Sequence, residues 1–172
     1  MNIYLIGYRG TGKTTLGRAL SRKFRRKFVD LDLLIEEREG RKIEEIFAKD
    51  GEKYFRDIEH KVLSEIARQS DLIVSTGGGI VILPENREII KSTGITIYLT
   101  ADDKTIYKRI KNDKNRPPLT SKPPLEEVHH LLSIRKPFYE ELADITIDTS
   151  VSNIEDCSKK IIEFIKIKGP VI

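Results

Sequence analysis

The strongest constraint on this chain lies near its N-terminus. Residues 7–14 read GYRGTGKT, which matches the pattern G-x-x-x-x-G-K-[ST]. A short apolar run, Ile3 to Ile6, precedes this segment, and a helical spacing of apolar residues follows from Lys13 to Lys23. Glycines in such a loop let the backbone turn successive N–H groups inward, and the helix N-terminus adds partial positive charge. The segment predicts a strand, a phosphate-binding loop and a helix, in that order.

The rest of the chain repeats this alternation. Short β-type runs recur at 28–29, 72–74, 95–99 and 145–147, and longer segments with helical spacing separate them. Capping-box patterns that begin at Thr100 and Ser152 indicate two helix starts. Strands that alternate with helices form a parallel sheet covered on both faces. At 172 residues, the chain is expected to form a single α/β domain over residues 1–172.

Composition narrows the classes of function. The chain is 38% hydrophobic and 34% charged, and it has neither a long apolar run nor a signal-peptide pattern at its start. A net charge of +4 suits an anionic ligand, but the basic residues are interleaved with 27 acidic ones and no nucleic-acid motif accompanies them. The single cysteine, Cys157, predicts no internal disulfide. We expect a cytoplasmic protein that binds neither nucleic acid nor a membrane.

Two residues of the loop define its chemistry. Lys13 stands where a lysine reaches the β- and γ-phosphates, and Thr14 supplies a hydroxyl to Mg²⁺. The loop alone indicates a nucleoside triphosphate, since GTPases and ATP-driven motors share it. Guanine-specific GTPases normally carry N-K-x-D after a later strand, whereas the nearest string here, at 112–115, reads NDKN. The sequence favours ATP and phosphoryl transfer to a small acceptor.

Two carboxylates follow the second predicted strand. Asp30 and Asp32 lie at its C-terminal end, which is where ligands bind in open α/β sheets. If the backbone stays extended, residues two apart share one face, so one carboxylate would serve Mg²⁺ and the other the acceptor. The alternative interpretation is that Asp32 only caps the following helix.

An arginine and a run of glycines are further candidates. Arg56 lies near the start of a helix that we predict from about Gly51, and Glu59 follows one turn later. An arginine there is usually solvated, but near the strand ends it can clamp a carboxylate bidentately. Gly77, Gly78 and Gly79 follow the third predicted strand. Such a run indicates either backbone brought against a ligand or a tight turn.

The segment from Lys111 to Pro124 departs most from regular patterning. It contains four of the seven prolines together with several short polar residues, so we expect a long loop. Loops of this length in compact domains often act as lids that exclude water from the transferring phosphoryl group. We assign the lid to approximately 111–124.

Taken together, these residues resemble the shikimate kinases of the nucleoside-monophosphate-kinase-like P-loop group, nearly end to end. The resemblance rests on the following positions: Gly7 to Thr14, Asp30, Asp32, Ile46, Phe47, Gly51, Glu52, Phe55, Arg56, Glu59, Gly77 to Gly79, Arg116, Pro117, Arg135, Tyr139, Glu141, Ala143 and Asp144. The family pattern usually has leucine at the position of Pro118, two residues after the lid arginine. The extra proline should stiffen the base of the lid. The resemblance implies a three-layer P-loop fold whose five parallel strands run in the order 2-3-1-4-5.

The resemblance also implies a site, position by position. The acceptor-binding region would span approximately 32–60. Shikimate would be bound by Asp32, Arg56, Gly77, Gly78, Gly79 and Arg135. ATP would be bound by Gly10, Thr11, Gly12, Lys13, Thr14, Thr15, Arg109, Arg116 and Ser152, with Arg109 and the segment 149–152 near the adenine. Catalysis would depend on Lys13, Asp32 and Arg116. Mg²⁺ would be held by Thr14 and, through water, by Asp30.

The implied activity is ATP-dependent phosphorylation of the shikimate 3-hydroxyl, which yields shikimate 3-phosphate and ADP in aromatic amino acid biosynthesis. In this interpretation Asp32 orients or deprotonates the attacking hydroxyl, and Arg116 stabilises charge on the transferring phosphoryl group. Two alternatives remain: another small polyhydroxy-acid kinase such as gluconate kinase, and a nucleotide-binding regulator without activity. We expect a monomer.

Overall fold

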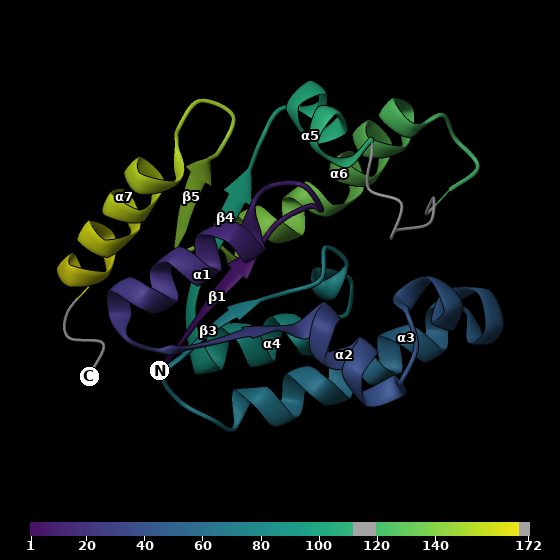
Figure 1. Cartoon of the computed structure of the whole chain (residues 1–172), viewed down its shortest axis with the longest axis horizontal. Helices are drawn as coiled ribbons and strands as arrows, with labels where there is room; N and C mark the ends of the chain where they lie inside the picture. The colour runs from purple at the N-terminus through teal and green to yellow at the C-terminus, as the bar shows by residue number, and fades with distance from the viewer. Residues whose placement is uncertain (112–119, 169–172) are drawn as a thin grey trace.

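The computed structural model describes residues 1–111 and 120–168 of the chain. Its five strands are β1 (Asn2–Ile6), β2 (Lys27–Asp30), β3 (Leu72–Ser75), β4 (Gly94–Thr100) and β5 (Ile145–Asp148). All pair in parallel, in the order β2-β3-β1-β4-β5, which confirms the expected sheet. Their carboxyl ends therefore lie along one edge (Figure 1).

Helices connect the strands and cover both faces of the sheet. They are α1 (Lys13–Phe24), α2 (Leu31–Glu39), α3 (Ile43–Ala67), the 3₁₀ turn η1 (Ile80–Ile82), α4 (Pro84–Thr93), α5 (Asp103–Ile110), α6 (Pro124–Leu142) and α7 (Ile154–Ile167). In Figure 1, α1 and α7 lie on one side of the strands, and α2, α3 and α4 lie on the other. The three-layer α/β architecture is as predicted.

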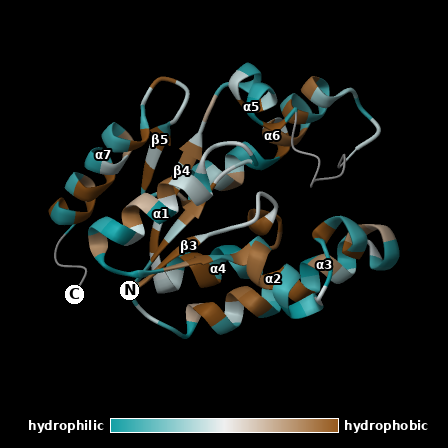
Figure 2. Ribbon diagram, viewed as in Figure 1, coloured by the Kyte–Doolittle hydropathy of each residue, from teal (hydrophilic) through white to brown (hydrophobic). Residues whose placement is uncertain are grey.

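Alternating residues of the central strand separate two hydrophobic cores. Ile3 and Leu5 of β1 pack with residues of α1 and α7, whereas Tyr4 and Ile6 pack with residues of α2, α3, α4 and α6. All four of these side chains are 0% exposed. A strand buried on both faces reads as a continuous apolar run, which is why β1 carries no polar alternation. Figure 2 shows the strands as a hydrophobic layer between helices of mixed character.

Two helices begin later than the capping-box patterns suggested. The N-cap of α5 is Asp102 rather than Thr100, and its carboxylate accepts from the Thr105 N–H at 2.8 Å. The N-cap of α7 is Asn153 rather than Ser152. Thr100 cannot cap α5 because it is the last residue of β4 and is paired with β5 in the sheet.

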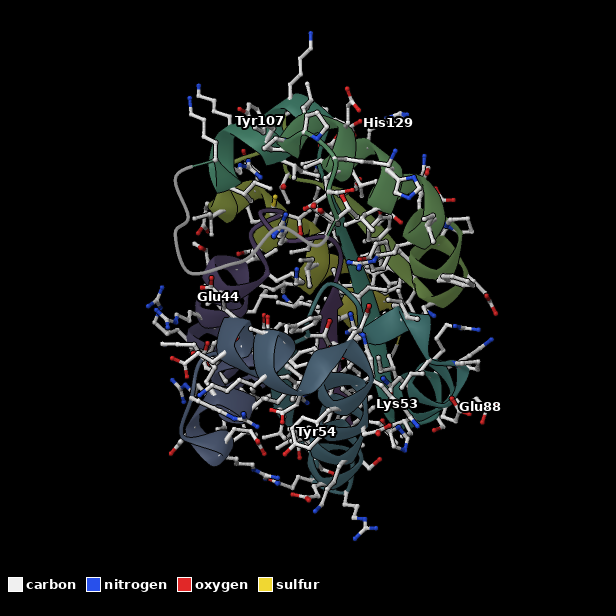
Figure 3. The ribbon with its side chains drawn as sticks, turned by 90° about the vertical axis from the view of Figure 1, so that its right-hand side faces the viewer. Glu44, Lys53, Tyr54, Glu88, Tyr107 and His129 are labelled. Atoms are coloured by element: carbon white, nitrogen blue, oxygen red, sulfur yellow. The ribbon has the colours of Figure 1, made fainter. Side chains whose placement is uncertain are left out.

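The long helix α3 is two helices joined at Gly51. That residue has φ 82° and ψ 173°, a conformation that is essentially restricted to glycine. The break agrees with the predicted helix start near Gly51, and it places Arg56 in the early turns of the second part. The exposed side chains of α3 include Glu44, Lys53 and Tyr54 (Figure 3).

Among the helices that the structure describes, none combines the length and the apolar character needed to cross a membrane.

Candidate active site

The carboxyl edge of the sheet gathers the loops that the sequence singled out. The loop after β1 is the glycine-rich segment, β2 ends at Asp30, and β3 leads into Thr76 and the three glycines. The Thr76 backbone N–H and hydroxyl both donate to the Leu5 carbonyl, each at 3.1 Å, so the third loop is fixed to the first strand. Open parallel sheets bind ligands at this edge.

The glycine-rich loop has the geometry of an anion site. Gly10 and Gly12 have φ angles of 81° and 91°, which glycine adopts without strain. α1 starts at Lys13 without a side-chain cap, so the first N–H groups of the helix are left for the loop interior. Lys13 is 8% exposed, and its Nζ donates to the carbonyls of Gly7 at 2.7 Å and Tyr8 at 2.8 Å. The ammonium group therefore lies across the concave side of the loop.

The two aspartates are arranged differently from the extended pair that we expected. Asp30 ends β2 and is itself the N-cap of α2, accepting from the Leu33 N–H at 3.4 Å. Asp32 lies in the first turn of α2. The expectation that the two share one face of an extended chain is wrong, because the helix starts between them. The helix turn nevertheless keeps both at the cavity wall, and the Thr14 hydroxyl donates to Asp30 Oδ2 at 2.7 Å.

Arg56 is buried and held by two carboxylates. Its guanidinium donates to Glu59 Oε2 at 2.6 Å and to Glu52 Oε1 at 3.1 and 3.2 Å. Burial opposes the charged form of Arg56, but these carboxylates outweigh it and raise its pKa. Glu59 is 1% exposed, and its Oε1 finds no hydrogen-bond partner among the described residues. Burial raises the pKa of Glu59 to about 7, against the opposing effect of Arg56.

The three glycines leave room for charged side chains. A β-carbon at Gly79 would lie 2.3 to 2.6 Å from three atoms of the Arg56 guanidinium group, and one at Gly77 would lie 2.6 Å from Glu59 Oε1 and 2.8 Å from Asp32 Oδ1. None of the three has a positive φ angle. Gly77 and Gly79 therefore matter because they have no side chain, which leaves space for these charged groups, and not because of backbone freedom. The run leads into η1, which agrees with the tight-turn interpretation, and the approach of its backbone to a ligand stays a prediction.

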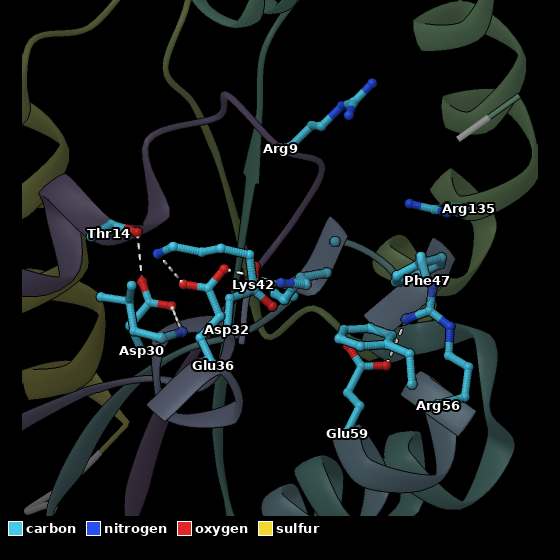
Figure 4. Close-up of a pocket in the computed structure, with 16 residues that line it drawn as sticks. Arg9, Thr14, Asp30, Asp32, Glu36, Lys42, Phe47, Arg56, Glu59 and Arg135 are labelled. Atoms are coloured by element: carbon cyan, nitrogen blue, oxygen red, sulfur yellow. Dashed lines mark hydrogen bonds and ion pairs between the residues drawn. The ribbon is translucent and has the colours of Figure 1, made fainter. Parts of the chain in front are cut away.

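Two cavities open at this edge. The larger, about 310 Å³, is lined by Arg9, Thr14, Asp30, Asp32, Leu33, Glu36, Lys42, Ile43, Phe47, Phe55, Arg56, Glu59, Gly77, Gly78, Gly79 and Arg135 (Figure 4). The smaller, about 180 Å³, is lined by Arg9, Gly10, Gly12, Lys13, Thr14, Thr15, Asp30, Asp32, Ser75 and Thr76. Four residues line both: Arg9, Thr14, Asp30 and Asp32. The phosphate loop and the arginine-lined cavity therefore adjoin.

Helix α6 closes the larger cavity from the side opposite α2. Arg135 is 6% exposed, and Figure 4 shows it extending from α6 toward the cavity. Tyr139 donates a hydrogen bond from its hydroxyl to the Gly78 carbonyl, which ties the helix to the glycine run. Burial raises the pKa of Tyr139, so its hydroxyl keeps the proton that it donates.

Sequence reasoning missed two residues at this edge. Arg9 occupies a variable position of the loop motif, yet it lines both cavities and pairs with Glu127 of α6 at 2.5 Å. The motif leaves this position unspecified, so the only signal for Arg9 was its place within the loop. Nothing in the sequence indicated a role for Glu127, since a glutamate in the first turn of a helix is commonplace.

The residues expected near ATP fall into three groups. Gly10, Gly12, Lys13, Thr14 and Thr15 line the smaller cavity, and Thr11 is buried beneath the loop, its hydroxyl donating to the Tyr8 carbonyl. Arg109 lies beside the loop, where it donates to the Gly10 carbonyl at 3.2 Å and to Thr149. Ser152 lines neither cavity, and Arg116 and Pro118 lie outside the described residues.

Comparisons with known proteins agree on one family. The family model described as shikimate kinase matches residues 9–166. A shikimate kinase from a Sulfurihydrogenibium species is 42% identical over 165 residues, covering 96% of this chain and 98% of that protein. One from Pelotomaculum thermopropionicum is 41% identical, covering 96% and 95%. The structure of shikimate kinase from Acinetobacter baumannii in complex with shikimate has a TM-score of 0.93 at 40% identity, covering 98% of this chain and 94% of that one. The chain belongs to the shikimate kinase family.

Proposed function

We propose that this chain transfers the γ-phosphoryl group of ATP to the 3-hydroxyl of shikimate, with the two adjoining cavities holding donor and acceptor. One observation supports this division of the site most directly: Thr14, Asp30 and Asp32 line both cavities, so groups bound in the two meet at a shared wall. The family model and the relatives named above are all shikimate kinases, so the gluconate kinase alternative is not favoured.

The acceptor is proposed to bind in the larger cavity through its carboxylate and its hydroxyls. Arg56 and Arg135 are buried cations that both line that cavity beside the glycine run, and a guanidinium matches a carboxylate with two parallel hydrogen bonds. Glu59 and Glu52 fix Arg56 in place before any ligand binds, which reduces the ordering cost on binding. Asp32, which lines the smaller cavity together with the phosphate loop, is proposed to orient the attacking hydroxyl or accept its proton.

The donor is proposed to bind along the loop and the start of α1. The uncapped N–H groups of α1 and the Lys13 ammonium group supply positive charge where phosphate oxygens accumulate negative charge. Arg109 and the segment 149–152 are proposed to lie near the adenine, because Arg109 joins Gly10 to Thr149. Arg116 is proposed to stabilise the transferring phosphoryl group from a lid at approximately 111–124.

The residues around Thr14 suit Mg²⁺. A hydroxyl and a carboxylate, those of Thr14 and Asp30, lie 2.7 Å apart at the junction of the cavities, and such hard oxygen donors are what Mg²⁺ prefers. The described residues contain no group of three or more His, Cys, Asp or Glu that could hold a metal, so phosphate oxygens would complete the coordination. Thr14 would bind the ion directly and Asp30 through water. When bound, the ion neutralises charge on the β- and γ-phosphates.

We further propose that the chain acts as one kinase domain over residues 1–172, as a monomer in the cytoplasm, and supplies shikimate 3-phosphate to aromatic amino acid biosynthesis. The test is a coupled ADP-release assay with Mg·ATP and shikimate, gluconate or no acceptor. Wild type should turn over only with shikimate, and Asp32→Asn should abolish most of that turnover. Turnover with gluconate alone, or none with either acid despite tight ATP binding, would overturn the assignment.

A further inference from the structure

A buried glutamate on α6 joins the phosphate loop to the chain that precedes α6. Glu127 is 1% exposed, and its Oε1 accepts from Arg9 Nη2 at 2.5 Å. Its Oε2 accepts from the backbone N–H of Thr120 at 2.7 Å and from the Thr120 hydroxyl at 3.0 Å. A buried carboxylate loses its hydrogen bonds to water, so these three hydrogen bonds stabilise the charge of Glu127.

Arg9, the cation that pairs with Glu127, lines both cavities. In Figure 4, however, its side chain runs away from Asp30 and Asp32 toward α6. Arg135 lies nearby, because the guanidinium carbons of Arg9 and Arg135 are 5.8 and 5.9 Å from the centre of the same Tyr8 ring. Two like charges therefore flank one aromatic ring, and Glu127 neutralises one of them.

A third arginine in the larger cavity would compete with the other two. A guanidinium binds carboxylate and phosphate alike, so an arginine released at the junction could hold the acceptor acid away from Arg56. It could also bind a free anion where the acceptor belongs. Discrimination between binding modes requires an element that disfavours the wrong one. A buried counter-charge on Arg9 is such an element.

We propose that Glu127 is a positioning residue: it holds Arg9 against α6, so that the acceptor carboxylate meets Arg56 and Arg135 and not Arg9. This inference rests on the proposed function, because it concerns the same acceptor site. It adds Glu127, which acts on that site by positioning Arg9. The link to Thr120 fixes the same carboxylate from its other oxygen, so the position of Arg9 depends on the start of α6 being in place.

The test uses Glu127→Gln, Arg9→Met, the double variant and a matched control, Glu126→Gln, at the exposed neighbour in the same helix turn. Glu127→Gln keeps the shape but removes the charge, and it should raise the shikimate KM at least about fivefold. It should also tighten binding of inorganic sulfate, measured by calorimetry, by a similar factor. Adding Arg9→Met should reverse both changes, and Glu126→Gln should match wild type.

The outcomes separate this inference from the proposed function. A gain in sulfate affinity that depends on Arg9 supports the proposal, because removal of the negative charge by itself would tighten sulfate binding in the Arg9→Met background as well. Unchanged sulfate affinity in Glu127→Gln, or a gain that survives Arg9→Met, overturns it. Calorimetry needs no turnover, so if wild type fails to phosphorylate shikimate, the proposed function falls while the sulfate series still decides the role of Glu127.

Discussion

Adding one methyl group at Gly79 should disable the proposed carboxylate clamp of Arg56 while leaving the fold in place. The residue has φ −98° and ψ 3°, which alanine adopts without strain, so the backbone does not oppose Gly79→Ala. The new β-carbon would instead lie 2.3 Å from Arg56 Nη2, well inside the 3.4 Å at which ordinary contact begins. Because a guanidinium is the free end of a flexible side chain, Arg56 rather than the backbone has to move, by about 1 Å.

That displacement sets the expected magnitude. A misplacement of about 1 Å costs roughly 100-fold in catalytic efficiency, and moving Arg56 also strains its 2.6 Å hydrogen bond to Glu59. We therefore expect kcat/KM for shikimate to fall roughly 100-fold, mainly through KM, with the ATP KM nearly unchanged. Weakening of the Arg56–Glu59 bond should cost about 1 to 3 kcal/mol in the free energy of unfolding.

The assay is coupled ADP release at saturating Mg·ATP over a range of shikimate concentrations, with urea melts for stability. Gly78→Ala is the graded comparison, since its β-carbon would lie no closer than 3.4 Å to any neighbour, and a much smaller rise in KM is expected. An unchanged shikimate KM in Gly79→Ala, or equal effects of the two variants, would refute the reasoning that the missing side chain at Gly79 makes room for Arg56.

Three further predictions concern the groups around this clamp. Burial raises the pKa of Glu59 from 4.5 to about 7, so the folded chain holds that proton more tightly than the unfolded chain does. Its contribution to stability is full below about pH 4.5 and declines as pH rises toward 7, by about 3 kcal/mol at most, and Glu59→Gln should remove this slope from urea melts at different pH values. Tyr139→Phe deletes the donor to the Gly78 carbonyl and should cost about 1 kcal/mol of stability and raise the shikimate KM; an unchanged KM would show that this bond does not position the glycine run. Thr14→Ala removes a hydroxyl from the proposed Mg²⁺ site, so titrations of activity against Mg²⁺ should shift to higher concentration, and an unshifted curve would contradict that assignment.

The sequence predicted the frame of the site because local patterns determine it. A glycine-rich loop between an apolar strand and a helix has one common geometry, and parallel strands bring the loops that follow them to one edge. Asp32 and the glycine run could therefore be placed together from the sequence, whereas Arg56 lies within α3 and was assigned to the site through the family resemblance. The start of a helix near Gly51 was also predicted, from the apolar spacing that follows it.

What the sequence did not predict depends on a choice between two nearby helix caps and on partners that are distant in the chain. Asp30 and Asp32 were placed on an extended face, but whether α2 starts before or after Asp32 is decided by which carboxylate caps it. The pair formed by Arg9 and Glu127 spans 118 positions, and neither residue carries a local pattern that indicates the other. The use of Gly79 to seat a guanidinium likewise becomes visible only when Arg56 is placed in space.

The wall shared by the two cavities has a consequence for ligand design. Because Thr14, Asp30 and Asp32 line both spaces, a single compound could be designed to reach both proposed subsites across this wall. Joining a cyclic acid to an oligophosphate through a short bridge would place the anionic ends against Arg56 and Lys13 respectively. Linking two modest binders in this way converts the second binding event into an intramolecular one, so the gain in affinity comes from geometry already present in the protein.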